Sequence, residues 1–395
     1  MKRSVYSASF SFTAALCIAL TIGACGGGGG SGSPESSSAG NSSSAGGYAA
    51  DGAFRFKIKT DNPGGSADNE FTVPADTVRY TYRYDIDCDD DGIDEGVGVE
   101  GNYTCTYAAP GTYTVAIRGT FPHPWFGGGT DTEKLLSVEM WGDQPWQSMK
   151  EAFKNCTNMT VEAADTPDLS RVTDMSSMFF KAEKFNQPIN DWDVGNVENM
   201  NSLFQEAKRF NQPLDRWDVS HVREMNWMFA YTYNFNQPIG NWDVSHVKSM
   251  CCMFIYASSF NQPLNDWDVG RVTNVLGMFE YTATFNQPLD KWDVSNVKKM
   301  QIMFYDAEAF NQDIGNWNVG NVENMSAMFA EAKSFDGNVE RWCGKTANVT
   351  DMGRMFKNAA AFSGHDLSCW DVSKVTDHHD FGTGWGSGNV EPNWR

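Results

Sequence analysis

Large apolar residues recur along most of the chain with a fixed period of 25 residues. Tryptophan keeps this step at Trp192, Trp217, Trp242, Trp267, Trp292, Trp317 and Trp342. Phenylalanine keeps the same step at Phe185, Phe210, Phe235, Phe260, Phe285, Phe310 and Phe335. Self-similarity at such a period is the signature of a repeat architecture, in which each unit buries its apolar surface against the next copy. The pattern therefore predicts an elongated stack of coils.

Within each unit the apolar spacing changes from two residues to three and four. In the copy that begins at Phe185, Trp192 and Val194 alternate with polar neighbours, as in a short strand. The apolar residues that follow are spaced as on one face of a helix, at Val197, Met200, Leu203, Phe204 and Ala207. We therefore predict a repeat solenoid over residues 131–380, with a short parallel strand plus a short helix in each 25-residue repeat.

The segment before the repeats alternates apolar and polar residues with period 2. Phe54–Lys59 and Tyr80–Tyr84 show the alternation, and Asn62–Gly65 marks a turn. This pattern predicts a small β-sandwich domain over residues 51–130. The run Leu135–Trp141 is expected to form the first strand of the stack.

The chain begins with the pattern of a bacterial lipoprotein. A basic start is followed by an apolar run that is too short to span a bilayer, so residues 1–24 are predicted to be a signal peptide. The run ends in Ile22–Cys25, which resembles a lipobox whose Cys25 thiol would receive the lipid. The alternative is ordinary cleavage after Ala24, which would release a free secreted protein. Residues 25–50 would then be the lipidated Cys and a Gly/Ser tether.

Charge and the residue after the lipobox bear on location and partners. The chain has 50 Asp and Glu against 30 Lys and Arg, a net charge of -20, which disfavours nucleic acid and anionic membranes as partners.

Gly26 stands where an Asp would resemble an inner-membrane retention signal, so the resemblance implies anchoring in the outer membrane. We expect a cell-surface protein that contacts the membrane only through its lipid anchor.

Two segments resemble known families. The spacing of Ile189, Trp192 and Val194 echoes a leucine-rich repeat, and the whole unit resembles the repeats of BspA-like surface lipoproteins. Tyr84–Asp87 followed by Pro110–Ile117 resembles an immunoglobulin-like domain of the polycystic-kidney-disease (PKD) type. BspA-like proteins are implicated in attachment, so the resemblance implies binding to a protein on a host, in the matrix or on a neighbouring cell.

The first domain holds a candidate disulfide and a candidate cation site. Cys88 and Cys105 flank an acidic loop and, in an oxidising compartment, are expected to bridge neighbouring strands. Asp87, Asp89 and Asp91 alternate along the loop, so their carboxylates could converge on calcium. The alternative is a solvated acidic turn, because glycine stands where an EF-hand loop needs its last glutamate. No other cofactor is expected.

The C-terminal end of the repeats departs from the pattern and is expected to close the stack. Cys343 and Cys369 follow and precede successive tryptophans, which predicts a second disulfide between adjacent coils. Residues 381–395 are polar and rich in glycine, so they are predicted to be a cap or tail.

Identical positions stack into columns, and most columns are expected to be structural. The tryptophans should pack in the core. Asn186 and its equivalents should bond backbone groups of the adjacent coil, and Asp193 and its equivalents should bond turn amides. One outward column varies freely, at Asp191, Arg216, Asn241, Asp266, Lys291, Asn316 and Arg341. Varied side chains on a rigid rod predict a protein-binding face, the alternative being merely solvated positions or contacts elsewhere.

No constellation of catalytic residues stands out in the sequence. The nearest is His378-His379-Asp380, which is more typical of a surface pair than of a metal site. We therefore expect a non-enzymatic binding or adhesion module. The alternatives are an envelope scaffold that self-associates and, least favoured, a polysaccharide-acting enzyme or carbohydrate-binding protein.

Overall fold

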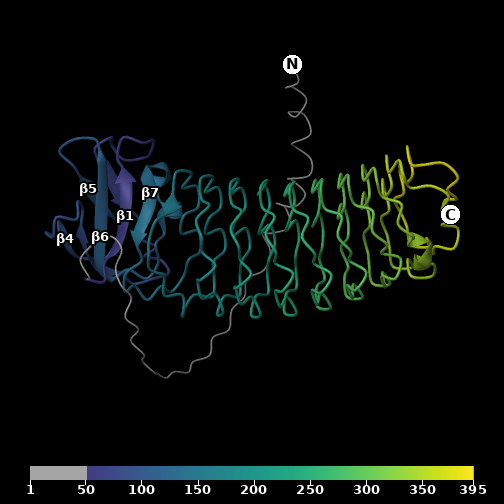
Figure 1. Ribbon diagram of the computed structural model, residues 1–395, viewed down its shortest axis with the longest axis horizontal. Coiled ribbons are helices and arrows are strands. Elements are labelled where there is room, and N and C mark those ends of the chain that lie inside the picture. The colour runs from purple at the N-terminus through teal and green to yellow at the C-terminus, as the bar shows by residue number, and fades with distance from the viewer. Residues whose placement is uncertain (1–50, 395) are drawn as a thin grey trace, which may run out of the picture. The chain divides into compact units, whose positions relative to one another are not determined.

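The structure is a computed structural model that describes residues 51–394 and consists of a β-sheet domain followed by a row of stacked coils (Figure 1). The predicted signal peptide, Cys25 and the tether lie outside the described residues. Within the described part, no helix has the length and apolar character that crossing a membrane requires.

The first domain contains two sheets. The larger is six-stranded, in the order β4-β3-β6-β1-β7-β8, and the smaller pairs β2 with β5. Their bounds are β1 Phe54–Lys59, β2 Glu70–Val73, β3 Arg83–Asp87, β4 Gly96–Val99, β5 Tyr103–Thr106, β6 Thr112–Thr120, β7 Leu135–Met140 and β8 Thr160–Val161. Phe56 of β1 and Phe71 of β2 meet between the sheets, with ring centroids 5.9 Å apart. A β-sheet domain therefore precedes the repeats, as the alternating pattern predicted.

The six-stranded sheet continues into the coils without a break. β7 is antiparallel to β1, pairing Val138 with Phe56, and parallel to β8, pairing Ser137 with Thr160. The predicted first strand of the stack is therefore confirmed, but the expected domain boundary near residue 130 is not a structural gap. The first coil begins at the β7–β8 edge of the sheet, and the sheet therefore covers one end of the stack.

The predicted helices are wrong. Residues 51–394 contain only three short 3-10 helices, η1 Phe126–Gly128, η2 Thr132–Lys134 and η3 Val339–Trp342, and no α-helix. The segment from Met200 to Ala207 is instead a run of tight turns, with left-handed backbone at Ser202 (φ 57°) and Glu206 (φ 60°). An L-residue with positive φ interrupts a right-handed helix, so the apolar spacing of three and four here reflects consecutive turns.

The turns in one coil bond the turns in the next. The amides of Met200, Ser202 and Phe204 donate to carbonyls 24 residues further on, at 3.0, 2.8 and 3.0 Å respectively. Intervening amides close turns within the coil, as from Leu203 to Met200 at 3.3 Å. In an α-helix the backbone amides donate to carbonyls of the same helix. Here alternate amides donate to carbonyls of the adjacent coil. The stack is therefore held by a ladder that runs along the rod.

The strand predicted at Trp192 is also displaced. The predicted alternation of burial is present, since Trp192 and Val194 are buried while Asp191 and Asp193 are exposed. The backbone pairs elsewhere, in single parallel bridges just before each run of turns. These bridges follow one column, Asp174, Asn199, Glu224, Ser249, Asn274, Lys299, Asn324, Asp351 and Asp377.

The asparagine column forms the predicted bonds between coils. The side-chain oxygen of Asn186 accepts a bond from the backbone amide of Asn211 at 2.8 Å and from the side-chain nitrogen of Gln212 at 3.2 Å. Asn211, Asn236, Asn261 and Asn286 accept the same pair of bonds from the coil that follows each of them. The unvarying Asn and Gln positions therefore satisfy polar groups at the turn.

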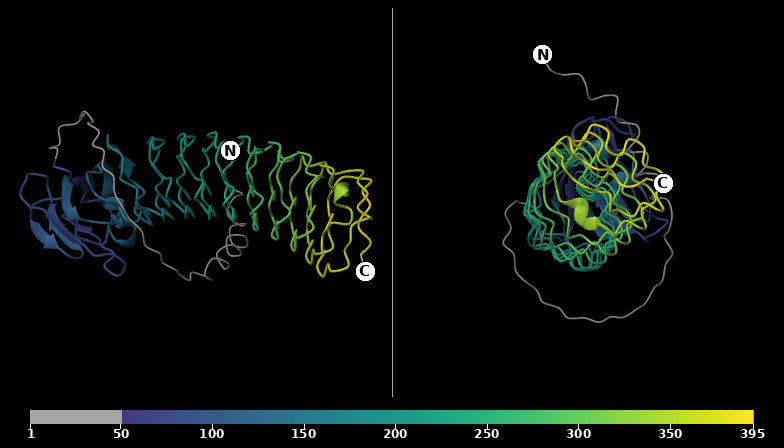
Figure 2. Two further views of the ribbon diagram at one scale, coloured as in Figure 1. Left: turned by 90° about the horizontal axis from the view of Figure 1, so that it is seen from below. Right: turned by 90° about the vertical axis from the view of Figure 1, so that its right-hand side faces the viewer.

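The interior is a continuous stack of aromatic rings. Phe204 lies 5.7 Å from Phe229 in the next coil and 4.0 Å from Phe210 in its own. From Trp217 onward, the indole N–H of each tryptophan in this column donates to a carbonyl of the preceding coil, as from Trp217 to Ile189 at 2.9 Å. Side and end views show the coils stacked one behind another along the rod (Figure 2). The tryptophan column is core, as predicted.

Removing one link of the asparagine ladder should weaken the stack. In Asn236→Ala the amides of Asn261 and Gln262 lose a shared acceptor at 2.9 and 3.0 Å. Leaving such groups unpaired should lower the stability by about 1–3 kcal/mol. Asn234→Ala is the control, because exposed Asn234 donates only one long bond, to Lys208 at 3.2 Å. Urea midpoints followed by circular dichroism measure both, and equal midpoints would contradict the ladder's role.

His123 lies where the sheet domain meets the first coil and is fully buried. Its Nε2 lies 2.7 Å from the carbonyl of Lys150, its ring packs on Tyr80, and Nδ1 has no hydrogen-bond partner among the described residues. Burial lowers the pKa of this imidazole below its usual value, outweighing Asp76 and Asp174 nearby. The ring is therefore held neutral.

Acidification should therefore destabilise the fold through His123. The unfolded imidazole takes a proton near pH 6.5 while the folded one resists, so this contribution to stability is present above that pH and is lost progressively below it. His123→Gln retains a donor toward Lys150 without titrating. We expect urea midpoints measured at pH 7.5 and 5.5 to fall less in the variant than in the parent, and an equal fall would refute this assignment.

Candidate functional site

The predicted binding column lies on the surface of the rod, and its charges are paired within it. Arg216 bonds Asp191 at 2.6 Å and Lys291 bonds Asp266 at 2.7 Å, with all four side chains at least 63% exposed. Asn241 and Asn316 donate instead to carbonyls of the preceding coil. Arg341, the last member, lies 3.4 Å from Asp313. The column is thus a surface of alternating signs with no large excess charge.

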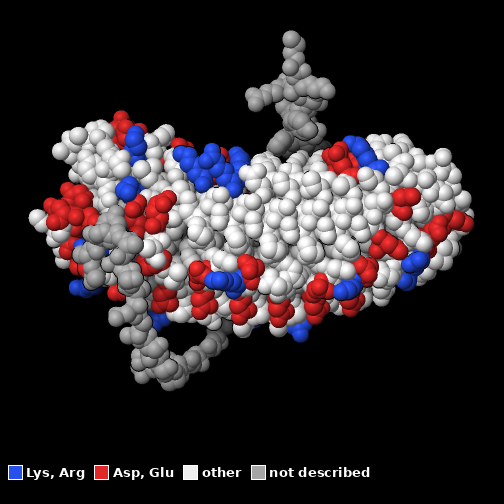
Figure 3. All heavy atoms as spheres, viewed as in Figure 1, with Lys and Arg blue, Asp and Glu red and all other residues white. Residues whose placement is uncertain are grey.

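Charged side chains gather in rows along the rod rather than over its whole surface. Figure 3 shows acidic groups recurring at regular intervals along one edge, with basic groups among them and a broad uncharged band above. Several ion pairs join equivalent positions of adjacent coils, including Lys208 with Glu183 and Lys333 with Glu308. Exposed pairs of this kind contribute little stability, so they are free to vary.

The aspartate column has the predicted structural role. The Oδ1 atoms of Asp193, Asp218 and Asp243 each accept a bond from the backbone amide two residues later, at 3.0–3.1 Å. Hydrogen bonding to Ser220, from its side chain first and then its amide, lowers the pKa of Asp218 below its usual value. Each of these carboxylates caps a turn through this bond, as the sequence predicted for the column.

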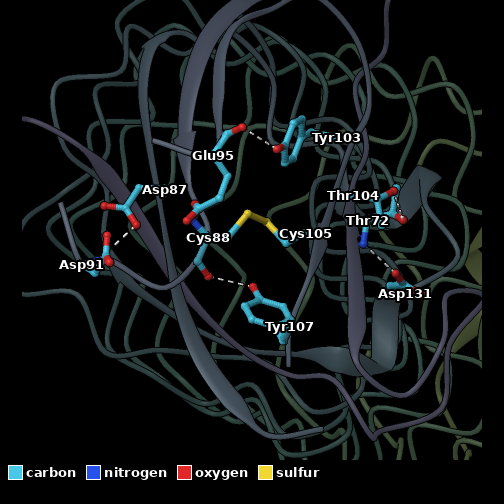
Figure 4. The surroundings of a disulfide bond; sticks show 10 residues. All are labelled: Thr72, Asp87, Cys88, Asp91, Glu95, Tyr103, Thr104, Cys105, Tyr107 and Asp131. Carbon is cyan, nitrogen blue, oxygen red and sulfur yellow. Dashed lines mark hydrogen bonds between the residues drawn. A yellow bond between two sulfur atoms is a disulfide. The ribbon is translucent and has the colours of Figure 1, made fainter. Parts of the chain in front are cut away.

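Cys88 and Cys105 form the predicted disulfide, but it joins the two sheets rather than neighbouring strands of one. Cys88 directly follows β3 in the larger sheet and Cys105 lies in β5 of the smaller. Figure 4 shows the polar groups around it: the Glu95 carboxylate accepts the Cys88 amide at 2.7 Å, and the Tyr107 hydroxyl donates to the Cys88 carbonyl at 2.7 Å. The bridge therefore pins the acidic loop to both sheets.

The acidic loop brings the three predicted calcium ligands together. Asp87, Asp89 and Asp91 each offer an oxygen within 4.8 Å of the others. Buried Asp87 already accepts the amides of Asp91 and Gly92, at 3.2 and 2.9 Å, and lies 4.0 Å from the Arg118 guanidinium. Burial and then the charges of Asp91 and Asp87 raise the pKa of Asp89. These bonds favour the acidic-turn alternative, and the calcium site stays a prediction.

The second predicted disulfide is absent. Cys343 and Cys369 are exposed thiols in adjacent coils, and the Cys343 sulfur lies 3.5 Å from the Cys369 carbonyl oxygen. Burial first, and then the neighbouring Cys343 thiol, raise the pKa of Cys369 to about 11. The two residues are adjacent, as the spacing predicted, but the coil is closed by packing: Trp370 stacks on Trp342 at 5.8 Å.

The histidine pair at the C-terminal end points in two directions. His378 stacks on Trp394 with ring centroids 4.3 Å apart, while the Nδ1 atom of His379 lies 2.5 Å from Asp377. Asp380 bonds Lys357 at 2.8 Å instead of either histidine. The three residues do not converge on one point.

A column of tyrosines was missed by the sequence reasoning. Tyr231, Tyr256 and Tyr281 occupy one position of consecutive coils and are half-buried, with ring centroids 4.9 and 4.3 Å apart and nearly parallel planes. Tyr305 meets the end of this stack edge-on at 5.3 Å. Burial raises the pKa of Tyr256 to about 12. The 25-residue spacing of the three tyrosines is visible in the sequence and was the available signal.

A β-sheet domain followed by regular coils with stacked Asn and Gln ladders defines the chain as a repeat solenoid protein. Four overlapping segments match the family described as "Mycoplasma protein of unknown function, DUF285", at residues 147–267, 215–313, 236–342 and 287–385. Together they span more than half of the chain, which therefore belongs to this family. No curated protein and no solved structure matches the chain.

The acidic turn can be tested against the calcium site with two substitutions. Asp87→Asn weakens two backbone hydrogen bonds to a buried carboxylate and should cost about 1–3 kcal/mol. Asp89→Asn removes a carboxylate that is repelled by its neighbours and should leave stability unchanged or slightly higher. Melting temperatures in chelator and in millimolar calcium should coincide. A calcium-dependent rise that Asp89→Asn abolishes would establish the metal site instead.

Proposed function

We propose that the chain is a lipid-anchored cell-surface protein that acts as a protein-binding or adhesion module and not as an enzyme. The observation that carries the proposal is the contrast between columns. Positions that hold the coils together, such as the Asn186 column, barely vary, whereas the exposed column from Asp191 to Arg341 changes from coil to coil. A rigid frame with one varied exposed row is the usual design of repeat proteins that bind other proteins.

Sequence features outside the described residues support the same proposal. The lipobox-like segment with Cys25 and the Gly/Ser stretch up to residue 50 fit an anchored protein presented at the outer membrane surface. The resemblance of the repeats to BspA-like surface lipoproteins points to attachment. The partner would be a protein on a host, in the matrix or on a neighbouring cell.

The paired charges shape how such a face would recognise a partner. Because Asp191 and Arg216 already neutralise each other, binding would depend on matching their alternating pattern and not on a net field. This feature favours specificity over strong long-range attraction. It also leaves the partner free to replace one exposed ion pair by another at little cost.

A binding screen with matched variants tests the proposal. The full chain would be passed over immobilised extracellular-matrix proteins and polysaccharides and its binding followed by surface plasmon resonance. Asp191→Ala/Arg216→Ala should weaken binding about ten-fold. The control Glu198→Ala/Arg223→Ala removes an equally balanced exposed pair from another column and should leave binding unchanged. If the screen finds no ligand, the proposed function is wrong. If both variants lose binding equally, the column from Asp191 to Arg341 is not the binding face.

A further inference from the structure

The tyrosine column sits where the coil backbone disfavours bulky side chains. Tyr231, Tyr256 and Tyr281 all have left-handed backbone, with φ of 59°, 57° and 55°. This region costs an L-residue about 1–2 kcal/mol and is unusual for a large side chain. Three consecutive coils therefore carry an aromatic ring at a strained position.

The fold itself does not call for tyrosine there. Equivalent positions in other coils hold Glu206, Asp306 and Glu331 with φ of 60°, 52° and 60°, so the same turn forms with acidic residues. Stacking with neighbouring rings offsets part of the strain for tyrosine, but the strain itself belongs to the backbone, and the acidic residues at equivalent positions bear it too. The turn therefore forms without tyrosine, and the presence of half-buried rings in three consecutive coils points to a role for these rings on the surface.

More tyrosines enlarge the column into a patch. Tyr305 adjoins Tyr281, and the hydroxyls of Tyr256, Tyr281 and Tyr305 interact as a chain. Tyr233 lies beside the column and is 38% exposed. The rings stack on one another, so they present edges and hydroxyl groups outward instead of flat faces. Such a surface combines apolar contact with hydrogen bonding, as in many protein interfaces.

The charges around the patch are mostly acidic. Asp306 and the fully buried Glu280 act on Tyr256, and both raise its pKa. The one basic group acting on Tyr233 is Lys208, which is already paired with Glu183. Beyond the last tyrosine, Asp306 lies among Glu308 and Glu331, with Lys333 bonded to Glu308. A second copy of this chain, with a net charge of -20, would be repelled. Charge complementarity therefore selects a basic partner.

We propose that the column Tyr231–Tyr256–Tyr281, with Tyr305 and Tyr233, docks an extended segment of another protein that is rich in arginine and lysine. Arginine suits this surface because its guanidinium donates to hydroxyls and carboxylates while its stem packs on ring edges. The inference rests on the proposed function as a protein-binding module, and it places a contact on a different column from Asp191 and Arg216.

A labelled synthetic peptide of alternating Arg and Ser residues is the probe, and fluorescence anisotropy with the full chain at physiological salt is the measurement. In Tyr256→Asn/Tyr281→Asn the net charge is kept and asparagine tolerates positive φ, so the fold should melt at the same temperature or higher. We expect the Kd for the peptide to rise about ten-fold or more. A matching peptide of alternating Glu and Ser should not bind.

The control is His221→Asn/His246→Asn, which changes two exposed side chains at equivalent positions of consecutive coils in another column. Its Kd should match that of the parent chain. Equal affinity of the tyrosine variant and the parent would overturn the inference, because the peptide would then be held by diffuse charge, and so would a lack of peptide binding by the parent.

Failure of this inference differs from failure of the proposed function. If a matrix ligand is found and binds the tyrosine variant as tightly as the parent, the binding function stands and the tyrosine patch does not. If neither a matrix ligand nor the basic peptide binds the parent chain, both fall.

Discussion

Hydrogen bonds that run from one coil to the next are the interaction on which the rest of the rod depends. Alternate amides in each run of turns donate to carbonyls of the following coil, and the Asn186-type side chains add further bonds at the same interface. A single coil has no partners for these groups and exposes its aromatic face. Stability therefore belongs to the interfaces between coils, as expected for a quasi-one-dimensional protein.

The same constraint explains the strained backbone. To point alternate amides along the rod, the chain must pass through left-handed conformations twice in most coils, as at Ser202 and Glu206. The cost is offset by two kinds of regular contact, the stacked phenylalanines inside and the indole bonds from Trp217 and its later equivalents to the preceding coil. The N-terminal sheet supplies the first surface for this stacking through β7 and β8, so the two architectures form one body.

The periodicity of the sequence predicted which residues are buried, but it did not predict the secondary structure of each coil. The fixed 25-residue step gave the stack, the buried Trp192 column and the roles of Asn186 and Asp193, because each follows from a position repeating at constant depth. The helix prediction was wrong because apolar spacings of three and four also arise from consecutive turns. The positive φ that distinguishes such turns from a helix cannot be read from the apolar pattern of the sequence. Cys88 and Cys105 were paired correctly, but sequence spacing cannot tell neighbouring strands from facing sheets.

Candidate sites were harder to predict for a related reason. The exposed column at Asp191 was found because it varies, yet its internal ion pairing depends on side-chain reach between coils. The tyrosines at Tyr231, Tyr256 and Tyr281 repeat as plainly as the core does, so spacing alone gives no reason to separate them from it. Their half-exposed setting and unusual backbone distinguish them, and both are properties of the folded coil.

The direction of the bonds between coils has a mechanical consequence. Because they lie along the rod, tension applied to its two ends loads every interface equally, and the weakest interface opens first while the others stay closed. Each opened coil of 25 residues would release a length of chain of about 85 Å. A rod built this way would lengthen in steps under pull, so that the force it transmits stays limited until the last coil has opened.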